Sequence, residues 1–314
     1  MNKKLISLVI PIYNEESNVP LLYKSLMNNL SKLNQYKFEI ILINDGSQDK
    51  SLEIISKLIQ EDQRVKLIDF SRNFGKEAAT SAGCHLAKGN VVITMDADLQ
   101  HPPELIQELI AKWREGHEVV YTVRKENQGA SFTKKITSQI YWWIFNKISS
   151  VTSEPHSTDF RLMDRMVIET FKKLPERERL FRGLIDWMGY RRAKIYFTAP
   201  ERHSGKVAYS YGKLFHLAIN SITAFSLLPL RFAGYFGTFI TVSSFLFFLS
   251  MLITRWFINP LLFTALAFVI VANTFLIGIV LISLGFIALY IARIHDEVIG
   301  RPLYIIRKKT NFNE

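Results

Sequence analysis

Short apolar runs and longer amphipathic segments alternate over the first 124 residues of the chain. Runs rich in β-branched residues, which predict buried strands, lie at 5–10, 38–43, 65–70, 91–95 and 119–123. The segments between them carry apolar residues at helical spacing and predict helices at 19–32, 50–60, 77–87 and 103–115. Strands that alternate with helices of this length indicate an α/β fold with a doubly wound, mainly parallel sheet.

Beyond residue 124, two segments are amphipathic and rich in aromatic residues, 132–148 and 209–228. In the first, Ile136, Ile140 and Ile144 form a stripe, and the lysines lie off that stripe. This pattern is typical either of an ordinary core helix or of a helix that lies in a membrane interface.

Two uncharged runs follow, at 232–253 and 261–292, and Arg255 in the loop between them is charged. At a rise of ~1.5 Å per residue, each run is long enough to cross a hydrocarbon core of ~30 Å. We therefore expect a two-helix transmembrane hairpin over residues 230–293.

Basic residues flank both ends of this hairpin, at Arg231 and in the tail 294–314. The positive-inside rule then places both termini in the cytoplasm. The chain of 314 residues has a net charge of +11, which is typical of proteins that bind nucleic acid or an anionic membrane surface. The apolar C-terminal third favours the membrane, and nucleic acid is not expected as a partner. The single Cys84 excludes an internal disulfide and suits a reducing compartment.

The strand predicted at 91–95 leads into two carboxylates, Asp96 and Asp98, with Ala97 between them. Side chains two residues apart in a strand point to the same face, so we expect the two carboxylates to lie together. Paired carboxylates at the carboxyl end of a strand, where α/β sheets bind their ligands, suit a Mg²⁺ ion that also contacts phosphates. A solvated acidic turn is the alternative for a bare pair of this kind.

Three further loops are predicted at the same edge of the sheet, at 11–16, 44–47 and 71–76. Asp45, in the second, is suited to accept hydrogen bonds from a base or a ribose. Lys76, in the third, lies at a predicted helix N-terminus, where negative charge is stabilised. Each residue taken alone also fits a turn or a surface salt bridge. Their shared place at the sheet edge indicates a site.

Motifs in all four loops resemble those of the family 2 glycosyltransferases with a GT-A fold, a Rossmann-like architecture. They are Pro11-Ile12-Tyr13-Asn14-Glu15, Asn44-Asp45-Gly46-Ser47, Arg72-Asn73-Phe74-Gly75-Lys76-Glu77 and Asp96-Ala97-Asp98-Leu99-Gln100. Later motifs resemble the polyprenyl-phosphate branch, most closely the bactoprenol (undecaprenyl-phosphate) glucosyltransferases, which are kin of dolichol-phosphate mannose synthase. These motifs lie at 158–165, 174–177, 225–230 and 301–304.

The resemblance implies inverting transfer of a sugar, in the first place glucose from UDP-glucose, to undecaprenyl or another polyprenyl phosphate at the cytoplasmic membrane. The product would be a lipid-linked monosaccharide donor for cell-envelope glycosylation. N-acetylglucosamine, galactose, mannose and an aminoarabinose derivative remain open as the sugar, and so does a non-catalytic membrane scaffold on this fold. Mg²⁺ or Mn²⁺ as cofactor and a homo-oligomer, for example a tetramer, are also implied.

The resemblance also assigns roles to single residues. Contacts to the nucleotide sugar would come from Pro11, Tyr13, Glu15, Asp45 (to the uracil), Lys76, Asp96, Ala97 and Asp98. The metal ion would bind Asp96, Asp98 and Gln100. Asp159 would be the catalytic base or would only pair with Arg161, and Asp98 would be the second catalytic residue. The acceptor phosphate would bind Arg124, Arg202 and Lys206.

The expected organisation has four parts. Residues 1–130 form the nucleotide-sugar-binding half of the catalytic domain, 131–229 the acceptor side and membrane interface, 230–293 two transmembrane helices, and 294–314 a cytoplasmic basic tail. One departure from the family pattern is Asn44-Asp45, because many relatives have two acids there. Asp45, the residue expected to contact the base, is present.

Overall fold

The computed structural model describes residues 3–125, 154, 156–176, 180–198, 246, 253, 257 and 265–312. The chain divides into two compact units. The first consists of Met1–Tyr211 with Pro302–Glu314, and the second of Gly212–Arg301.

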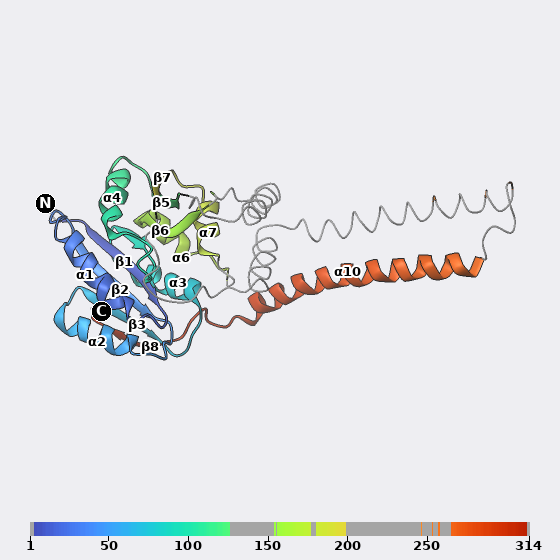
Figure 1. Ribbon diagram of the computed structural model, residues 1–314, viewed down its shortest axis with the longest axis horizontal. Helices are drawn as coiled ribbons and strands as arrows, with labels where there is room; N and C mark the ends of the chain where they lie inside the picture. The colour runs from blue at the N-terminus through green and yellow to red at the C-terminus, as the bar shows by residue number, and fades with distance from the viewer. Residues whose placement is uncertain are drawn as a thin grey trace. The chain divides into compact units, whose positions relative to one another are not determined.

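Within the described residues, the first unit contains an eight-stranded sheet of order β7-β5-β6-β4-β1-β2-β3-β8 (Figure 1). The strands are β1 Leu5–Ile12, β2 Lys37–Asn44, β3 Val65–Phe70, β4 Val91–Thr94, β5 Val119–Arg124, β6 Ser157–Asp164, β7 Arg192–Phe197 and β8 Ile306–Thr310. β1 pairs in parallel with β2 and β4, β2 with β3, and β5 with β7. β6 runs antiparallel between β4 and β5, and β8 runs antiparallel along β3.

The prediction of an α/β fold is confirmed, and the sheet is mixed. The five predicted strands correspond to β1–β5, because most residues in each are apolar and buried. β8 lies inside the segment expected to be a basic tail, 294–314, and its sequence Ile306-Arg307-Lys308-Lys309-Thr310 lacks such a run. It forms an edge strand whose basic side chains are exposed, which suits an edge that must not pair with other chains.

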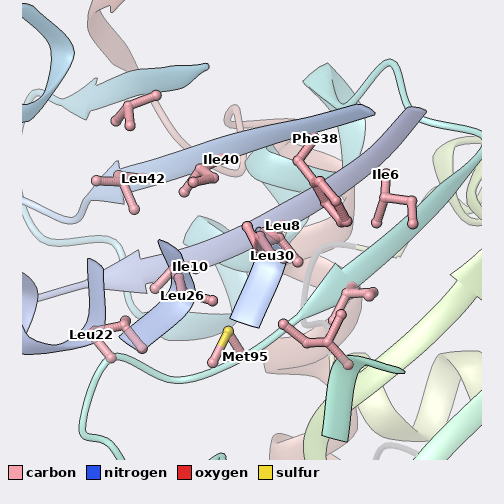
Figure 2. Close-up of a cluster of buried hydrophobic side chains, with 14 of the residues drawn as sticks. Ile6, Leu8, Ile10, Leu22, Leu26, Leu30, Phe38, Ile40, Leu42 and Met95 are labelled. Atoms are coloured by element: carbon pink, nitrogen blue, oxygen red, sulfur yellow. The ribbon is translucent and has the colours of Figure 1, made fainter. Parts of the chain in front are cut away.

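Helices cover both faces of the sheet. They are α1 Asn18–Leu30, α2 Ser51–Glu61, α3 Lys76–Leu86, η1 Pro103–Leu105, α4 Ile106–Arg114, α6 Arg165–Lys172 and α7 Phe181–Trp187. Leu22, Leu26 and Leu30 of α1 lie against Leu8 and Ile10 of β1 in the buried core (Figure 2). α3 lies on the opposite face, where it contacts β1, β2, α6 and α7. α1 and α3 therefore cover opposite faces of β1.

The second unit contains α10, Ala265–Ile299, which overlaps the second uncharged run. Among the residues that the structure describes, none belongs to a helix that meets the length and hydropathy required of a membrane span. Most of the first predicted membrane helix, 232–253, and both amphipathic segments, 132–148 and 209–228, lie outside the described residues. The transmembrane hairpin therefore stays a prediction.

Candidate active site

The carboxyl ends of β1, β2 and β4 meet at one edge of the sheet, as predicted. In the register of β1 and β2, Ile12 lies opposite Asn44, so the loops that follow both strands begin side by side. The backbone N–H of Asn14 donates to Ser47 Oγ at 3.1 Å, and the Gln48 N–H donates to Asn14 Oδ1 at 2.8 Å. The first two predicted loops therefore form one hydrogen-bonded unit.

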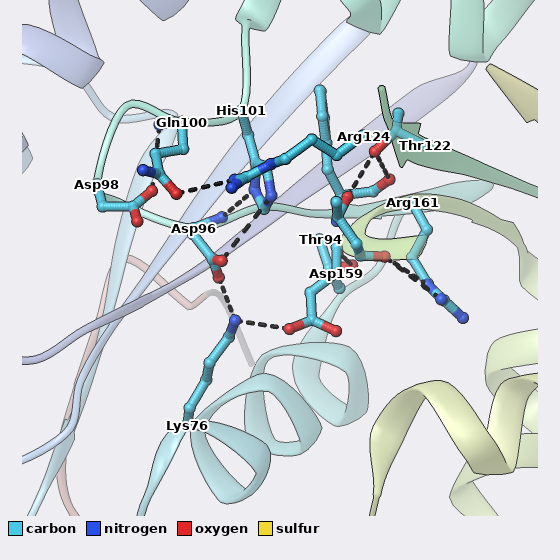
Figure 3. Close-up of polar contacts among 12 residues, drawn as sticks. Lys76, Thr94, Asp96, Asp98, Gln100, His101, Thr122, Arg124, Asp159 and Arg161 are labelled. Atoms are coloured by element: carbon cyan, nitrogen blue, oxygen red, sulfur yellow. Dashed lines mark hydrogen bonds and ion pairs between the residues drawn. The ribbon is translucent and has the colours of Figure 1, made fainter. Parts of the chain in front are cut away.

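The loop after β4 presents Asp96 and Asp98 at this edge, and Ala97 is buried between them (Figure 3). Leu99 has a φ of 64°, a backbone conformation that non-glycine residues rarely adopt. After this turn, the Gln100 N–H donates to Asp98 Oδ1 at 3.2 Å. The loop is thus folded so that both carboxylates and the Gln100 side chain lie close together.

Two side chains hold this loop in place, His101 from within the loop and Arg124 from β5. The His101 ring is buried, and its Nδ1 accepts from the Asp96 N–H at 2.9 Å. Burial lowers the pKa of His101, which favours the neutral ring that can accept at Nδ1. Arg124, at the end of β5, donates to Gln100 Oε1 at 2.8 Å. Arg124 was predicted to bind the acceptor phosphate and lies next to the carboxylate loop.

Lys76 joins two of the predicted carboxylates. Its Nζ lies 2.6 Å from Asp96 Oδ1 and 2.6 Å from Asp159 Oδ2 (Figure 3). Asp159 comes from β6, which lies beside β4, and its backbone carbonyl accepts from Thr94 Oγ1 at 2.6 Å. The residue predicted for the acceptor side and the residue predicted for the donor side therefore share one ammonium group.

Asp159 has a second cationic partner, Arg182 of α7, whose Nε lies 3.1 Å from Asp159 Oδ1. Burial alone would raise the pKa of Asp159, but the charges of Lys76 and Arg182 hold it well below its usual range. Arg161, the partner considered from sequence, is fully buried, and its Nη1 lies 3.7 Å from Asp186 Oδ1. Asp159 is therefore an ionised carboxylate between Lys76 and Arg182.

The predicted metal ligands are the Asp96 and Asp98 carboxylates and the Gln100 amide oxygen. Hard oxygen donors of this kind are the ligands that Mg²⁺ and Mn²⁺ take in proteins. Within the described part of the chain, no group of three His, Cys, Asp or Glu side chains is arranged to hold a metal ion. The Asp96 carboxylate forms an ion pair with the Lys76 ammonium, so a cation is already bound beside these donors. The chemistry of these donors fits a divalent ion whose remaining ligands come from phosphate.

Asp45 is buried, and both of its oxygens face the turn 71–75. Oδ1 accepts from the Phe74 N–H at 2.7 Å and Oδ2 from the Gly75 N–H at 3.0 Å. Burial raises the pKa of Asp45, and the two N–H groups offset part of that rise. Asp45 thus holds the turn that leads into α3 and Lys76, and its predicted contact with uracil stays a prediction.

The other predicted nucleotide contacts lie along the first loop. Pro11 is near the end of β1, and Tyr13 is 45% exposed at the sheet edge. Glu15 accepts from Asn18 Nδ2 at 2.6 Å, and its N–H donates to Ser51 Oγ at 2.9 Å. The two remaining acceptor residues, Arg202 and Lys206, lie outside the described residues.

Arg182, His101 and Glu77 lie at the site although they were not among the predicted site residues. Arg182 lies outside the recognised motifs, and only the three-dimensional fold places it beside Asp159. His101 follows the carboxylate motif directly, and a histidine within five residues of paired carboxylates is a signal that was available. Glu77 adjoins Lys76 and accepts from the Phe181 N–H at 2.9 Å, which links α3 to α7.

Glu77 leads to a prediction about stability. Burial and the nearby Asp159 charge raise the pKa of Glu77 from 4.5 to about 7. The native state then keeps a proton that the unfolded chain releases, so the free energy of unfolding falls as pH rises through that interval. In Glu77→Gln, which retains an acceptor for Phe181, this loss is expected to shrink by roughly 1–3 kcal/mol. Thermal unfolding at pH 5 and pH 8 measures it, and an unchanged pH dependence would contradict the assignment.

The mixed α/β sheet, with its loops and carboxylate pair gathered at one edge, is the fold and site on which the family comparison bears. The model of glycosyl transferase family 2 matches residues 7–170, which contain all four loops. The chain belongs to this family and is a glycosyltransferase.

Its relatives include an uncharacterized glycosyltransferase of Synechocystis sp., 42% identical over 301 residues that cover 96% of this chain and 94% of the relative. The SfII prophage-derived bactoprenol glucosyl transferase of Shigella flexneri is 40% identical over 309 residues, which cover 98% of this chain and 99% of the relative. Among solved structures, residues 1–349 of TarS from S. aureus with UDP-GlcNAc give a TM-score of 0.47 at 17% identity, covering 70% of this chain and 66% of that one.

Proposed function

We propose that this chain transfers a sugar, with glucose from UDP-glucose as the first choice, to undecaprenyl or another polyprenyl phosphate. The observation that carries the proposal is the Lys76 bridge, in which one ammonium group contacts both Asp96 and Asp159 at 2.6 Å. A site that joins two phosphate-bearing substrates has to bring both substrates to one place and stabilise their negative charge. Lys76 lies between Asp96, predicted to bind the nucleotide sugar, and Asp159, predicted to act on the acceptor. The bactoprenol glucosyl transferase of Shigella flexneri, similar over 98% of the chain, supports this acceptor.

The reaction is a displacement at the anomeric carbon of the sugar. An oxygen of the lipid phosphate forms a bond to that carbon, and the bond to the β-phosphate oxygen of the nucleotide breaks, so that UDP leaves. Attack from the opposite side inverts the anomeric configuration. A lipid phosphate is already an anion near neutral pH, so the chemistry requires charge stabilisation more than proton removal.

The residues divide this work between the two substrates. Asp96, Asp98 and Gln100 would hold Mg²⁺ or Mn²⁺, which when bound would neutralise charge on the leaving diphosphate. Lys76 and Arg182, both held by Asp159, place positive charge beside the loop that carries Asp96 and Asp98. Arg124, together with Arg202 and Lys206, would neutralise the acceptor phosphate.

The proposed location is the cytoplasmic face of the cell membrane, with two membrane spans and both termini in the cytoplasm. The uncharged runs and the basic residues at their ends support it. There the domain meets soluble UDP-sugar on one side and lipid acceptor on the other. A homo-oligomer is part of the same proposal.

A donor panel tests this function. The purified full chain in detergent is incubated with undecaprenyl phosphate and radiolabelled UDP-glucose, UDP-N-acetylglucosamine, UDP-galactose or GDP-mannose, with Mg²⁺, Mn²⁺ or a chelator. We expect a metal-dependent glycolipid from UDP-glucose. A glycolipid formed from another donor would correct the identity of the sugar and still support the proposed type of reaction. A chain that binds no nucleotide and makes no glycolipid would support the scaffold alternative instead.

A further inference from the structure

The C-terminal segment 302–311 returns to the first unit and contacts the end of β3. Tyr304 stacks on Phe70, the last residue of β3, with ring centroids 5.2 Å apart and an interplanar angle of 9°. Its hydroxyl lies 3.0 Å from His85 Nδ1 on α3. Tyr304 belongs to the motif 301–304, for which no role was predicted.

Backbone contacts reinforce this attachment at Ser71, the first residue after β3. The Ser71 N–H donates to the Ile305 carbonyl at 3.0 Å, and Arg307 donates to the Ser71 carbonyl at 2.8 Å. The pairing of β3 with β8 shifts register between Asp69 and Phe70, just before this point. The segment thus fixes where the chain leaves β3.

The turn that begins at Ser71 is the one that holds Asp45. Phe70 meets Phe74 edge to face, with centroids 5.6 Å apart, and the Phe74 N–H donates to Asp45 Oδ1 at 2.7 Å. A Cβ on Gly46 would lie 2.5 Å from Asn73 N, so the two loops are in tight contact there. A shift of Phe70 therefore moves Phe74, and with it both Asp45 and the start of α3 at Lys76.

We propose that Tyr304 is a positioning residue for the donor nucleotide. It touches no substrate; it holds Phe70 and the turn 71–75 so that Asp45 and Lys76 keep their places. The inference rests on the proposed function, because it assumes that this edge of the sheet binds a nucleotide sugar. It extends the site to a segment about 230 residues away in sequence from the turn that it supports.

Tyr304→Ala tests the inference by separating donor binding from acceptor binding. The loss of one ring stack and one hydrogen bond is expected to raise the Kd for UDP and the KM for the UDP-sugar by about tenfold. The KM for polyprenyl phosphate should stay unchanged. Tyr304→Phe retains the stack and loses the contact with His85, so it should restore most of the donor affinity.

Asn311→Ala is the matched control on the same segment. The Asn311 side chain donates to the carbonyls of Val65 at 3.0 Å and Ile59 at 3.4 Å, at the other end of the β3–β8 pair. This variant removes a comparable attachment without touching Phe70 or the turn. Its Kd for UDP should match that of the wild type, even where its melting temperature falls as far as that of Tyr304→Ala.

Isothermal titration of the full chain with UDP gives the answer without any sugar transfer. Equal Kd values in the wild type and Tyr304→Ala would overturn the inference, and so would equal losses in Tyr304→Ala and Asn311→Ala. A wild-type chain that binds UDP but glycosylates no polyprenyl phosphate would refute the proposed function, and the Tyr304 comparison would still be decided by titration. A wild-type chain that binds no nucleotide would overturn both.

Discussion

Asp98→Ala is expected to lower sugar transfer by about 10²–10³-fold while the fold remains intact, because a preorganised electrostatic contact to the leaving group is lost. Asp98 is partly buried at the sheet edge, and its Oδ1 accepts from the Gln100 N–H within the same loop. Truncating it leaves the hydrophobic core between α1 and β1 unchanged. The melting temperature should therefore stay close to that of the wild type.

The measurement is the initial rate of transfer as a function of metal concentration, for the wild type, Asp98→Ala and Asp98→Asn. Asp98→Asn retains the size of the side chain and removes the charge, so it should also be impaired if the carboxylate binds the ion. A rate near that of the wild type that is insensitive to chelator would refute the assignment of Asp98 as a metal ligand.

Asp159→Asn is expected to slow transfer by about 10²-fold with donor binding nearly unchanged, a loss within the range of a positioned catalytic group. The ionised carboxylate holds Lys76 and Arg182 at 2.6 and 3.1 Å, and a neutral amide would hold neither cation as firmly. Lys76 keeps its second contact, with Asp96 at 2.6 Å, so the positive charge beside the predicted donor residues stays in place and Arg182 is the cation released. Loss of UDP binding in this variant would instead place Asp159 on the donor side.

The pH profile of the wild type distinguishes the two roles of Asp159. Because Lys76 and Arg182 hold its pKa well below the usual range, Asp159 should be ionised at any pH at which the enzyme is stable. Its contribution to stability is present above the unfolded pKa and is lost only as pH falls through the lower native value. Transfer should show no decline attributable to Asp159 between about pH 5 and 9. A decline in the transfer rate within this pH range that is absent from Asp159→Asn would instead support Asp159 as the catalytic base.

The sequence was sufficient to predict the part of the fold in which local pattern and burial agree. β1 to β5 are rich in apolar residues because each is largely buried on both faces, and the loops after β1, β2 and β4 meet because parallel strands end at the same edge. β6 and β8 were missed for the converse reason. β6 carries Asp159, Arg161 and Asp164 among its apolar residues, and β8 is an exposed edge rich in basic residues.

Because β6 was not predicted, the contacts of the site that depend on it were not predicted either. β6 inserts antiparallel between β4 and β5, so Thr94 lies opposite Arg161 and Asp159 arrives beside the carboxylate loop. Arg182 then reaches Asp159 because α7 packs near α3. Contacts of this kind depend on a topology that residue spacing does not contain. Lys76, whose motif was recognised, was predicted as a donor contact, but its bridge to Asp159 needed the structure.

The products of the reaction test the central claim most directly. The full chain is supplied with UDP-glucose, undecaprenyl phosphate and Mg²⁺, the nucleotide released is identified by chromatography, and the phosphorus content of the glycolipid is determined by mass spectrometry. The account predicts UDP together with a glucosyl lipid that contains one phosphorus. UMP with a lipid diphosphate sugar, or UDP with free glucose and no glycolipid, would contradict it.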